Sequence, residues 1–436
     1  MRDKQTSEGY LYSKAHAWYV LFLLFMLMLF DFIDRQVLSA LLPYIKAEWT
    51  LSDTQLGSMM AIVNVAIALL AFPVSIVVDR WSRTKSISAM AILWSTATAG
   101  CALAGNFTQM LVGRFFIGAG EAGYAAGGAS LLSASFPHRL RSTVMGISQS
   151  AGMLGSVLGV VLGGVIAAKW GWRYALGVVA IPGFIFAVLI LFVRDYKNVK
   201  FEVKNHNSKQ DEGMSWQQAT GVILRSGALR PIFLGSAMQL LFNATVANWL
   251  PSYFNRFHDM AIDQSGMRTG LILLVASLGV VSFGFISDKL TAGVPRRRLM
   301  LMAFFALLTA LAFGAAFALP VGGAQMSLLF VGAFFMAAIL GPCYAVIHDL
   351  VHPGMTGMAI GLFVLGNNIL GMALGPIIGG VLADKFELNT ALLIVSAVPL
   401  SSALAFLIAS FRYDKAVEVL NDGQTPAPRG EMKVHL

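Results

Sequence analysis

Long runs of hydrophobic residues follow one another along this chain, and short polar segments separate them. Each run holds about 20 residues, which lets an α-helix cross a bilayer core of roughly 30 Å. The pattern therefore predicts an all-α membrane protein with twelve transmembrane helices. They are expected over residues 17–42, 55–78, 86–104, 109–131, 143–168, 174–193, 231–254, 267–287, 299–318, 324–347, 356–383 and 389–411.

A polar segment divides these helices into two sets of six. We expect an N-terminal tail (1–16), a six-helix bundle (17–193), a central loop (194–230), a second six-helix bundle (231–411) and a C-terminal tail (412–436). Four glycines of the fifth helix recur 216 residues later in the eleventh; they are Gly155, Gly159, Gly163 and Gly164, then Gly371, Gly375, Gly379 and Gly380. Such stripes let helices approach closely. Their repetition predicts two pseudo-symmetric bundles, as in transporters that rock around a central site.

Composition agrees with a membrane protein, because 12% of the residues are charged whereas a soluble domain has about 25%. The predicted inside segments hold 23 of the 31 Lys and Arg residues, and the outside loops hold six. Basic residues favour the cytoplasmic side, so both termini are expected inside an inner (plasma) membrane. This bias also explains the net charge of +9, and no nucleic-acid partner is expected.

Two motifs resemble the major facilitator superfamily. Asp79-Arg80-Trp81-Ser82-Arg83-Thr84-Lys85 resembles its loop between helices 2 and 3, and Gly113-Arg114-x2-Ile117-Gly118-x-Gly120-Glu121 resembles its fourth-helix motif. The resemblance implies alternating access driven by an ion gradient. It also implies a cytoplasmic gate at Asp79, Arg80 and Arg83, with Asp288 as the weaker repeat. The alternative is that these charges only anchor the loop on the inside. Val160 stands where many drug–proton antiporters have proline, which disfavours antiport.

Further residues resemble the anion:cation symporter branch of that superfamily. They are Asp34-Arg35, Glu121-Ala122-Gly123, Phe136-Pro137 and Trp249-Leu250-Pro251-Ser252-Tyr253. The resemblance implies proton-coupled uptake of a small organic anion, such as a sugar acid or an aromatic carboxylate. Spinster-like transporters share the Asp-Arg pair, so a lysolipid or amphiphile transporter is an alternative. A proton-coupled drug exporter is another, and a receptor-like scaffold is a third.

Five ionisable residues interrupt the predicted helices. Asp31, Asp34 and Arg35 lie in the first, and Arg114 and Glu121 lie in the fourth. With a helical rise of 1.5 Å per residue, both arginines are expected about 7 to 9 Å from the bilayer midplane, on its outer side. Asp31 and Glu121 are expected close to the midplane itself. Charges at this depth usually face a partner or a transport path. The alternative is an ion-pair network that only packs the two helices together.

From this arrangement we assign roles to the charges. Arg35 and Arg114 are the candidate substrate-binding cations, because a guanidinium suits a carboxylate bidentately. Asp31, Asp34 and Glu121 are the candidate proton carriers. Their three negative charges exceed the two positive ones, so a bound monoanion would favour about two bound protons.

Uncharged polar side chains complete the set. Tyr124, Gln149, Asn367 and Asn368 are further substrate-binding candidates, although an aromatic ring often packs and an amide often joins helices. The same two roles are open to Asn64, Gln239, Asn243 and Asn248. The sequence shows no nucleotide-binding loop, metal-ligand spacing or nucleophile motif, so we expect no enzyme activity and no cofactor. The expected partners are an organic anion, protons and the lipid bilayer, and the expected state is a monomer.

Overall fold

The computed structural model describes residues 10–194 and 220–422, except 222, 224, 292, 293, 295, 353 and 354. Its first half contains α1 (Lys14–Trp49), α2 (Asp53–Arg80), α3 (Arg83–Ala102), α4 (Phe107–Glu121), α5 (Tyr124–Ser135), η1 (His138–Leu140), α6 (Arg141–Trp170) and α7 (Trp172–Ile190). Its second half contains α9 (Leu229–Phe257), α10 (Ile262–Leu290), α11 (Arg296–Ala318), α12 (Gly323–Met336), α13 (Leu340–Leu350), α14 (Thr356–Gly366), the π-helix η3 (Asn367–Ala373), α15 (Leu374–Phe386), α16 (Leu388–Val395) and α17 (Val398–Asp422).

The expected twelve-helix fold is confirmed, and four of its spans are built from shorter helices. α4 and α5 form the fourth span, α12 and α13 the tenth, α14, η3 and α15 the eleventh, and α16 and α17 the twelfth. Within the described part of the chain, nine spans are long and apolar enough to cross a membrane by length and composition alone. The other three are α3, the fourth span and α9, in which polar side chains or a break lower the apolar character.

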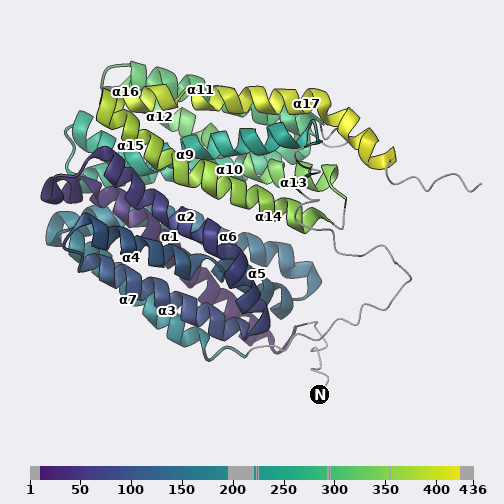
Figure 1. Ribbon diagram of the computed structural model, residues 1–436, viewed down its shortest axis with the longest axis horizontal. Helices are drawn as coiled ribbons and strands as arrows, with labels where there is room; N and C mark the ends of the chain where they lie inside the picture. The colour runs from purple at the N-terminus through teal and green to yellow at the C-terminus, as the bar shows by residue number, and fades with distance from the viewer. Residues whose placement is uncertain are drawn as a thin grey trace, which may run out of the picture.

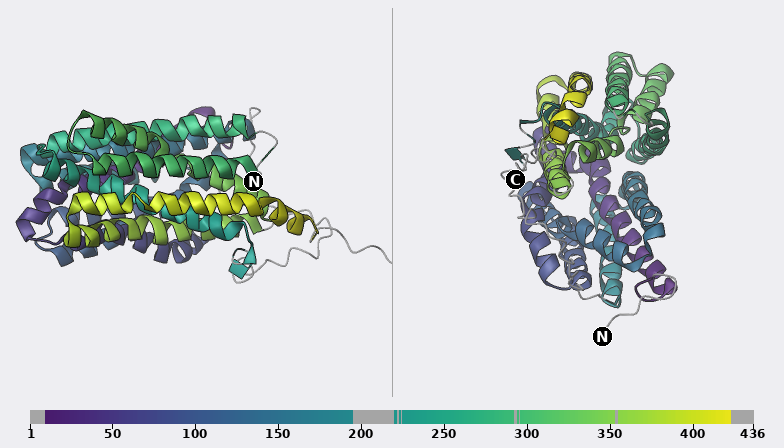
Figure 2. Two further views of the ribbon diagram at one scale, coloured as in Figure 1. Left: turned by 90° about the horizontal axis from the view of Figure 1, so that it is seen from above. Right: turned by 90° about the vertical axis from the view of Figure 1, so that its right-hand side faces the viewer.

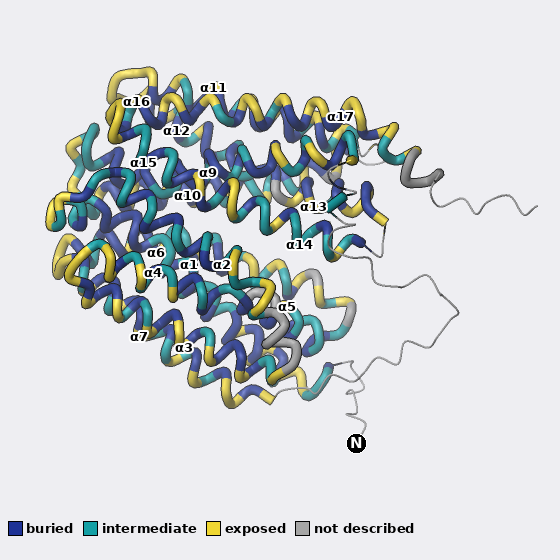
Figure 3. Tube along the Cα trace, viewed as in Figure 1, coloured by how far each residue is buried: buried dark blue, intermediate teal, exposed yellow. Residues whose placement is uncertain are grey.

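The helices form two bundles. Helices α1–α7 lie together in one group and α9–α17 in the other (Figure 1). The right-hand view of Figure 2 looks along the helices and shows the two groups side by side. Buried positions line the faces that helices turn toward one another, while exposed positions cover the outside (Figure 3). Many exposed residues are large and apolar, including Phe192 at 74% and Phe285 at 75%. This surface suits contact with lipid tails.

The glycine stripes hold equivalent helices together in each bundle. A Cβ atom on Gly155 would lie 2.5 Å from the Leu29 carbonyl oxygen, so α6 packs on the backbone of α1. In the second bundle, a Cβ atom on Gly371 would lie 3.1 Å from the Ala237 oxygen of α9. Larger residues would force these helices apart.

The last glycine of each stripe instead packs across the two bundles. A Cβ atom on Gly164 would lie 2.9 Å from the Ile262 oxygen, and one on Gly380 would lie 2.3 Å from the Asp53 oxygen. Ile262 begins α10 and Asp53 begins α2, so both contacts join the bundles at the same end of the molecule. We call it the Asp53 end.

Several predicted regions fall outside the described structure. They are most of both tails and of the central loop, together with the side chains of Asp79, Arg80 and Asp288. Arg83 is described and half-buried at the start of α3, which lies at the end opposite the Asp53 end. The predicted gate therefore stays a prediction.

The packing of α6 on α1 predicts the cost of a larger residue. Gly159→Leu should destabilise the protein by about 1–3 kcal/mol or more, because its Cβ atom would lie 2.7 Å from the Ile33 oxygen. Gly146→Leu is the matched control, since it lies on the same helix with nothing within 4 Å. Thermal unfolding of the purified proteins in detergent measures both. Equal stability of the two variants would contradict the packing described here.

Candidate substrate and coupling site

Three of the five predicted intramembrane charges meet directly. An Arg35 guanidinium nitrogen (Nη2) lies 2.6 Å from Glu121 Oε2, and its Nε donates to Asp31 Oδ1 at 3.3 Å. Arg35 therefore bridges an acid one turn earlier on α1 to an acid on α4. We call Asp31, Arg35 and Glu121 the Arg35 triad. Its net charge is −1 when all three groups are ionised.

The members of the triad differ in access. The side chains of Asp31 and Glu121 are 5% and 0% exposed, whereas that of Arg35 is 22% exposed. The Arg35 guanidinium also lies over the Phe32 ring, with Cζ 5.3 Å from the ring centroid. A cation over an aromatic face is stabilised by the ring quadrupole. Arg35 is thus the member that a molecule from outside the protein reaches first.

A break in the fourth span places Glu121. Glu121 is the last residue of α4, and α5 begins at Tyr124 after a turn at Ala122–Gly123. The run Gly118-Ala119-Gly120-Glu121-Ala122-Gly123 contains three glycines, which weaken a helix. Gly120 also lets α4 approach α3, because a Cβ atom there would lie 2.8 Å from the Trp94 nitrogen.

Asp34 and Arg114 lie outside the triad. Asp34 is buried and accepts a hydrogen bond from the Thr98 hydroxyl of α3. Arg114 is 2% exposed, and its Nε donates to the Met59 carbonyl of α2 at 3.3 Å. The two charges lie within electrostatic range of each other. Asp34 also lies within electrostatic range of Asp31 and Arg35, so the second pair, Asp34 and Arg114, lies beside the triad.

This second pair has unused hydrogen-bonding capacity. Asp34 Oδ1 and Arg114 Nη1 are buried without a hydrogen-bond partner among the described residues. A buried unpaired polar atom is costly, so its persistence needs a reason. Loading of a proton on Asp34 is one chemical use of such a site.

The uncharged candidates have different surroundings. Tyr124 is 5% exposed, its hydroxyl donates to the Leu24 carbonyl at 2.9 Å, and its ring packs edge-on against Trp94. In this conformation Tyr124 is a packing residue. Asn368 of η3 is half-buried and donates to the Val364 carbonyl of α14, one turn earlier in the same span, at 2.9 Å.

The remaining two candidates are Gln149 and Asn367. Gln149 is exposed on α6. Asn367 is buried at the start of the π-helix η3, and such local π-helices occur often at functional sites.

Sequence reasoning missed a cluster of charges at the Asp53 end. Arg256 of α9 holds Asp53 of α2 with two hydrogen bonds of 2.6 and 2.8 Å, and Lys46 adds a third at 2.6 Å. Asp384 of α15 in turn accepts from the backbone N–H groups of Asp53 and Thr54 at 2.7 and 2.8 Å. We call these five residues the Asp53 latch. No motif marks it, because its partners lie up to 331 residues apart.

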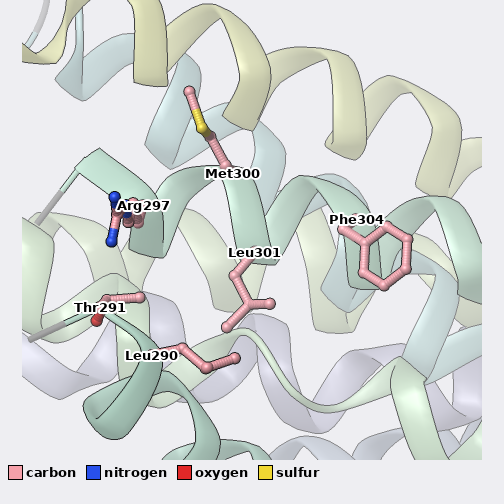
Figure 4. Close-up of a pocket in the computed structure, with 6 residues that line it drawn as sticks. All are labelled: Leu290, Thr291, Arg297, Met300, Leu301 and Phe304. Atoms are coloured by element: carbon pink, nitrogen blue, oxygen red, sulfur yellow. The ribbon is translucent and has the colours of Figure 1, made fainter. Parts of the chain in front are cut away.

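One pocket and the two cysteines lie away from the triad. A pocket of about 280 Å³ opens at the end opposite the latch, and Figure 4 shows its lining by Leu290, Thr291, Arg297, Met300, Leu301 and Phe304. It contains none of the intramembrane charges. Across the described residues, no group of three His, Cys, Asp or Glu side chains is placed to hold a metal ion. Cys101 and Cys343 are free and buried.

Comparison with known proteins identifies the family. The model of the Major Facilitator Superfamily matches residues 24–369 and 294–433, and the chain belongs to this superfamily. It is therefore a multi-pass membrane transport protein and not an enzyme.

Individual relatives were also found. A hexuronate transporter of Bacillus subtilis (strain 168) is 25% identical over 393 residues, which cover 86% of this chain and 90% of the relative. A cis,cis-muconate transport protein of Acinetobacter baylyi is 28% identical over 286 residues, covering 63% and 68%. The solved structure of a bacterial homologue of the human lysosomal transporter Spinster has a TM-score of 0.78 at 22% identity, covering 95% of this chain and all of that one. This last likeness concerns the fold.

The latch predicts how the two bundles separate. Arg256→Ala should weaken closure of the Asp53 end, because the nearly buried Asp53 carboxylate loses its two-pronged partner. Spin labels at Leu103 and Val321, which are exposed loop residues of the first and second bundle, report the separation. The labels are attached to cysteines introduced at these positions in a protein whose native cysteines are replaced. The distances between the labels should be longer in Arg256→Ala than in the protein that retains Arg256.

Arg173→Ala is the control for this measurement. Arg173 pairs with Glu48 at 2.8 Å within the first bundle, at the same end. Its loss should leave the label distances unchanged. If the label distances were unchanged in Arg256→Ala, or if both variants showed the same shift, the Asp53 latch would not be what holds this end closed.

Proposed function

We propose that this protein is a secondary active transporter that takes up a small organic anion together with protons by alternating access. The observation that carries the proposal is the Arg35 triad, in which one accessible cation bridges two buried carboxylates. It binds an anion and responds to that binding at the same place.

Anion binding follows from the geometry of Arg35. Its planar guanidinium stays charged and can hold a carboxylate with two parallel hydrogen bonds. In the structure its Nη2 is engaged by Glu121 and its Nε by Asp31. A substrate carboxylate that arrives at the exposed part of Arg35 therefore competes with these acids for the same donors.

Proton coupling follows from the burial of Glu121. A fully buried carboxylate is costly to keep ionised when its counter-charge is taken by another anion. Substrate binding thus favours protonation of Glu121, and protonation of Glu121 frees Arg35 for the substrate. Linkage makes the two effects reciprocal.

Charge balance sets the stoichiometry we propose. The triad and the Asp34–Arg114 pair together carry one net negative charge when ionised, and a bound monoanion adds a second. Two protons would neutralise the occluded site, with Asp34 as the second carrier and Asp31 held mainly as a partner of Arg35. Import of one monoanion with two protons moves net positive charge inward, so the transport is electrogenic.

The relatives support the substrate class. Those named for hexuronate and for cis,cis-muconate both take their names from organic acids, and the first covers most of this chain. A sugar acid or an unsaturated carboxylate is therefore the substrate class we propose. Transport of a fluorescent lysolipid with no response to carboxylates would instead favour a Spinster-like function.

The orientation completes the proposal. The distribution of basic residues puts both termini in the cytoplasm of an inner membrane, so the latched Asp53 end faces outward. The structure then corresponds to the inward-facing state of a monomeric transporter. Asp79, Arg80, Arg83 and Asp288 would form the cytoplasmic gate of the opposite state, and Gln149, Asn367, Asn368 and Arg114 would assist binding.

The triad predicts separable effects of its members on uptake. In proteoliposomes with an acidic exterior and a negative interior, the wild type should accumulate a hexuronate, which is a monoanion. Arg35→Lys should lower the initial rate at least about tenfold, because a point charge replaces the bidentate fork. Glu121→Gln should lose accumulation driven by the proton gradient but retain exchange of internal for external substrate.

One outcome would refute the proposal outright. It is carboxylate uptake that is indifferent to the proton gradient and unchanged by Glu121→Gln. Asn255→Leu is a suitable control variant, because the Asn255 amide donates at 2.9 Å to the Met260 carbonyl at the Asp53 end, away from the triad.

A further inference from the structure

The glycine contacts align the first bundle with the second residue by residue. Gly155 and Gly159 approach the carbonyls of Leu29 and Ile33 on α1, and their repeats approach those of Ala237 and Leu241 on α9. Ala237 follows Leu29 by 208 positions, and Leu241 follows Ile33 by the same number. The backbone contacts therefore fix which residue of α9 is equivalent to which residue of α1.

In this register, two amides replace two charges. Residue 239, equivalent to Asp31, is Gln239, and residue 243, equivalent to Arg35, is Asn243. The amides also interact, with donor and acceptor exchanged, since Gln239 Nε2 donates to Asn243 Oδ1 at 3.4 Å. An ion pair one turn apart on α1 thus corresponds to an amide pair one turn apart on α9.

The third member of the triad has a counterpart as well. Glu121 ends α4 at the break of the fourth span, and Met336 ends α12 at the break of the tenth. The Met336 carbonyl accepts from Gln239 Nε2 at 3.0 Å and from Asn243 Nδ2 at 2.9 Å. A backbone oxygen therefore takes the place of the Glu121 carboxylate.

Access to the two sites is also alike. Gln239 is 0% exposed, as Asp31 is nearly buried, while Asn243 is half-buried and accessible like Arg35. Gln239 Oε1 is buried without a hydrogen-bond partner among the residues that the structure describes. α1 and α9 pack against each other across the interface between the bundles. The amide pair thus lies on the helix that faces the triad.

We propose that Gln239, Asn243 and the Met336 carbonyl form the uncharged half of the substrate site and bind a hydroxyl group of the transported anion. This inference rests on the proposed function of the Arg35 triad. A hydroxyl both donates and accepts, so it can donate to the free Gln239 oxygen and accept from the Asn243 amide. The subsite adds no charge and leaves the proton balance of the triad unchanged. It therefore selects the substrate but does not couple it to protons.

The opposing explanation is that the amides only hold the broken tenth span in place. Both donate to the carbonyl freed at the break, which is a structural role that needs no ligand. The two explanations differ in what they predict for ligands. A structural pin affects all substrates alike, whereas a binding subsite distinguishes a hydroxylated acid from the same acid without the contacting hydroxyl.

The experiment combines protein variants that lack one amide with ligands that lack one hydroxyl group. Binding of glucuronate, galacturonate and their monodeoxy analogues is measured by titration calorimetry on the full-length protein in detergent. The variants are Asn243→Leu, Gln239→Leu and Arg35→Ala, with Asn255→Leu, on the same helix but at the Asp53 end, as the matched amide control. Thermal unfolding of each variant reports whether the fold persists.

We expect Asn243→Leu to lower the affinity for a hydroxylated acid about tenfold. It should leave the affinity unchanged for the one monodeoxy analogue that lacks the contacting hydroxyl. Asn255→Leu should bind all of them like the wild type. Suppose that Asn243→Leu lowers the affinity for every acid equally, or for none, while Arg35→Ala still abolishes binding. The proposed subsite would then be refuted. Should the wild type bind none of these acids, sugar acids are not its substrates and the hydroxyl-binding subsite fails.

Discussion

A guanidinium held at bilayer depth must keep its counter-charges, and this requirement determines much of the structure. Arg35 cannot release its proton, so Asp31 and Glu121 have to lie beside it. Glu121 reaches it because the fourth span breaks immediately after that residue. α1 is in turn held in place by the glycine stripe of α6, which contacts its backbone. A substrate anion that satisfies Arg35 therefore disturbs the network that positions these helices.

The two bundles share a backbone plan and differ in chemistry. Equivalent glycines make equivalent contacts within and between the bundles, so the pseudo-symmetry is carried by small residues that let backbones approach. The side chains depart from it. The ion pair Asp31–Arg35 on α1 corresponds to the amide pair Gln239–Asn243 on α9, and Asp384 of the latch lies 216 positions after Ala168, which is uncharged. Charge is therefore concentrated in the first bundle at the candidate site. At the Asp53 end it is concentrated where α2 meets α15, and not where α6 meets α10.

The sequence predicts the fold well because a bilayer leaves few choices. Apolar runs of fixed length, the basic bias and the repeated glycines are all local signals, and the twelve spans follow from them. The Asp31–Arg35 pair is also local, since four residues make one turn. Which partner Arg114 and Asp34 take is not local. It depends on how α2 and α3 rotate, and those faces supply the Met59 carbonyl and the Thr98 hydroxyl. The latch escapes sequence reasoning for the same reason, because four helices of both bundles form it.

We propose above all that binding of an anion at Arg35 draws a proton onto Glu121. This coupling is tested most directly by calorimetric titration of a bound carboxylate in buffers with different ionisation enthalpies, because the buffer dependence counts the protons taken up. We expect net proton uptake on binding to the wild type and a smaller uptake in Glu121→Gln. Binding that depends on Arg35 but takes up no protons in the wild type would contradict it.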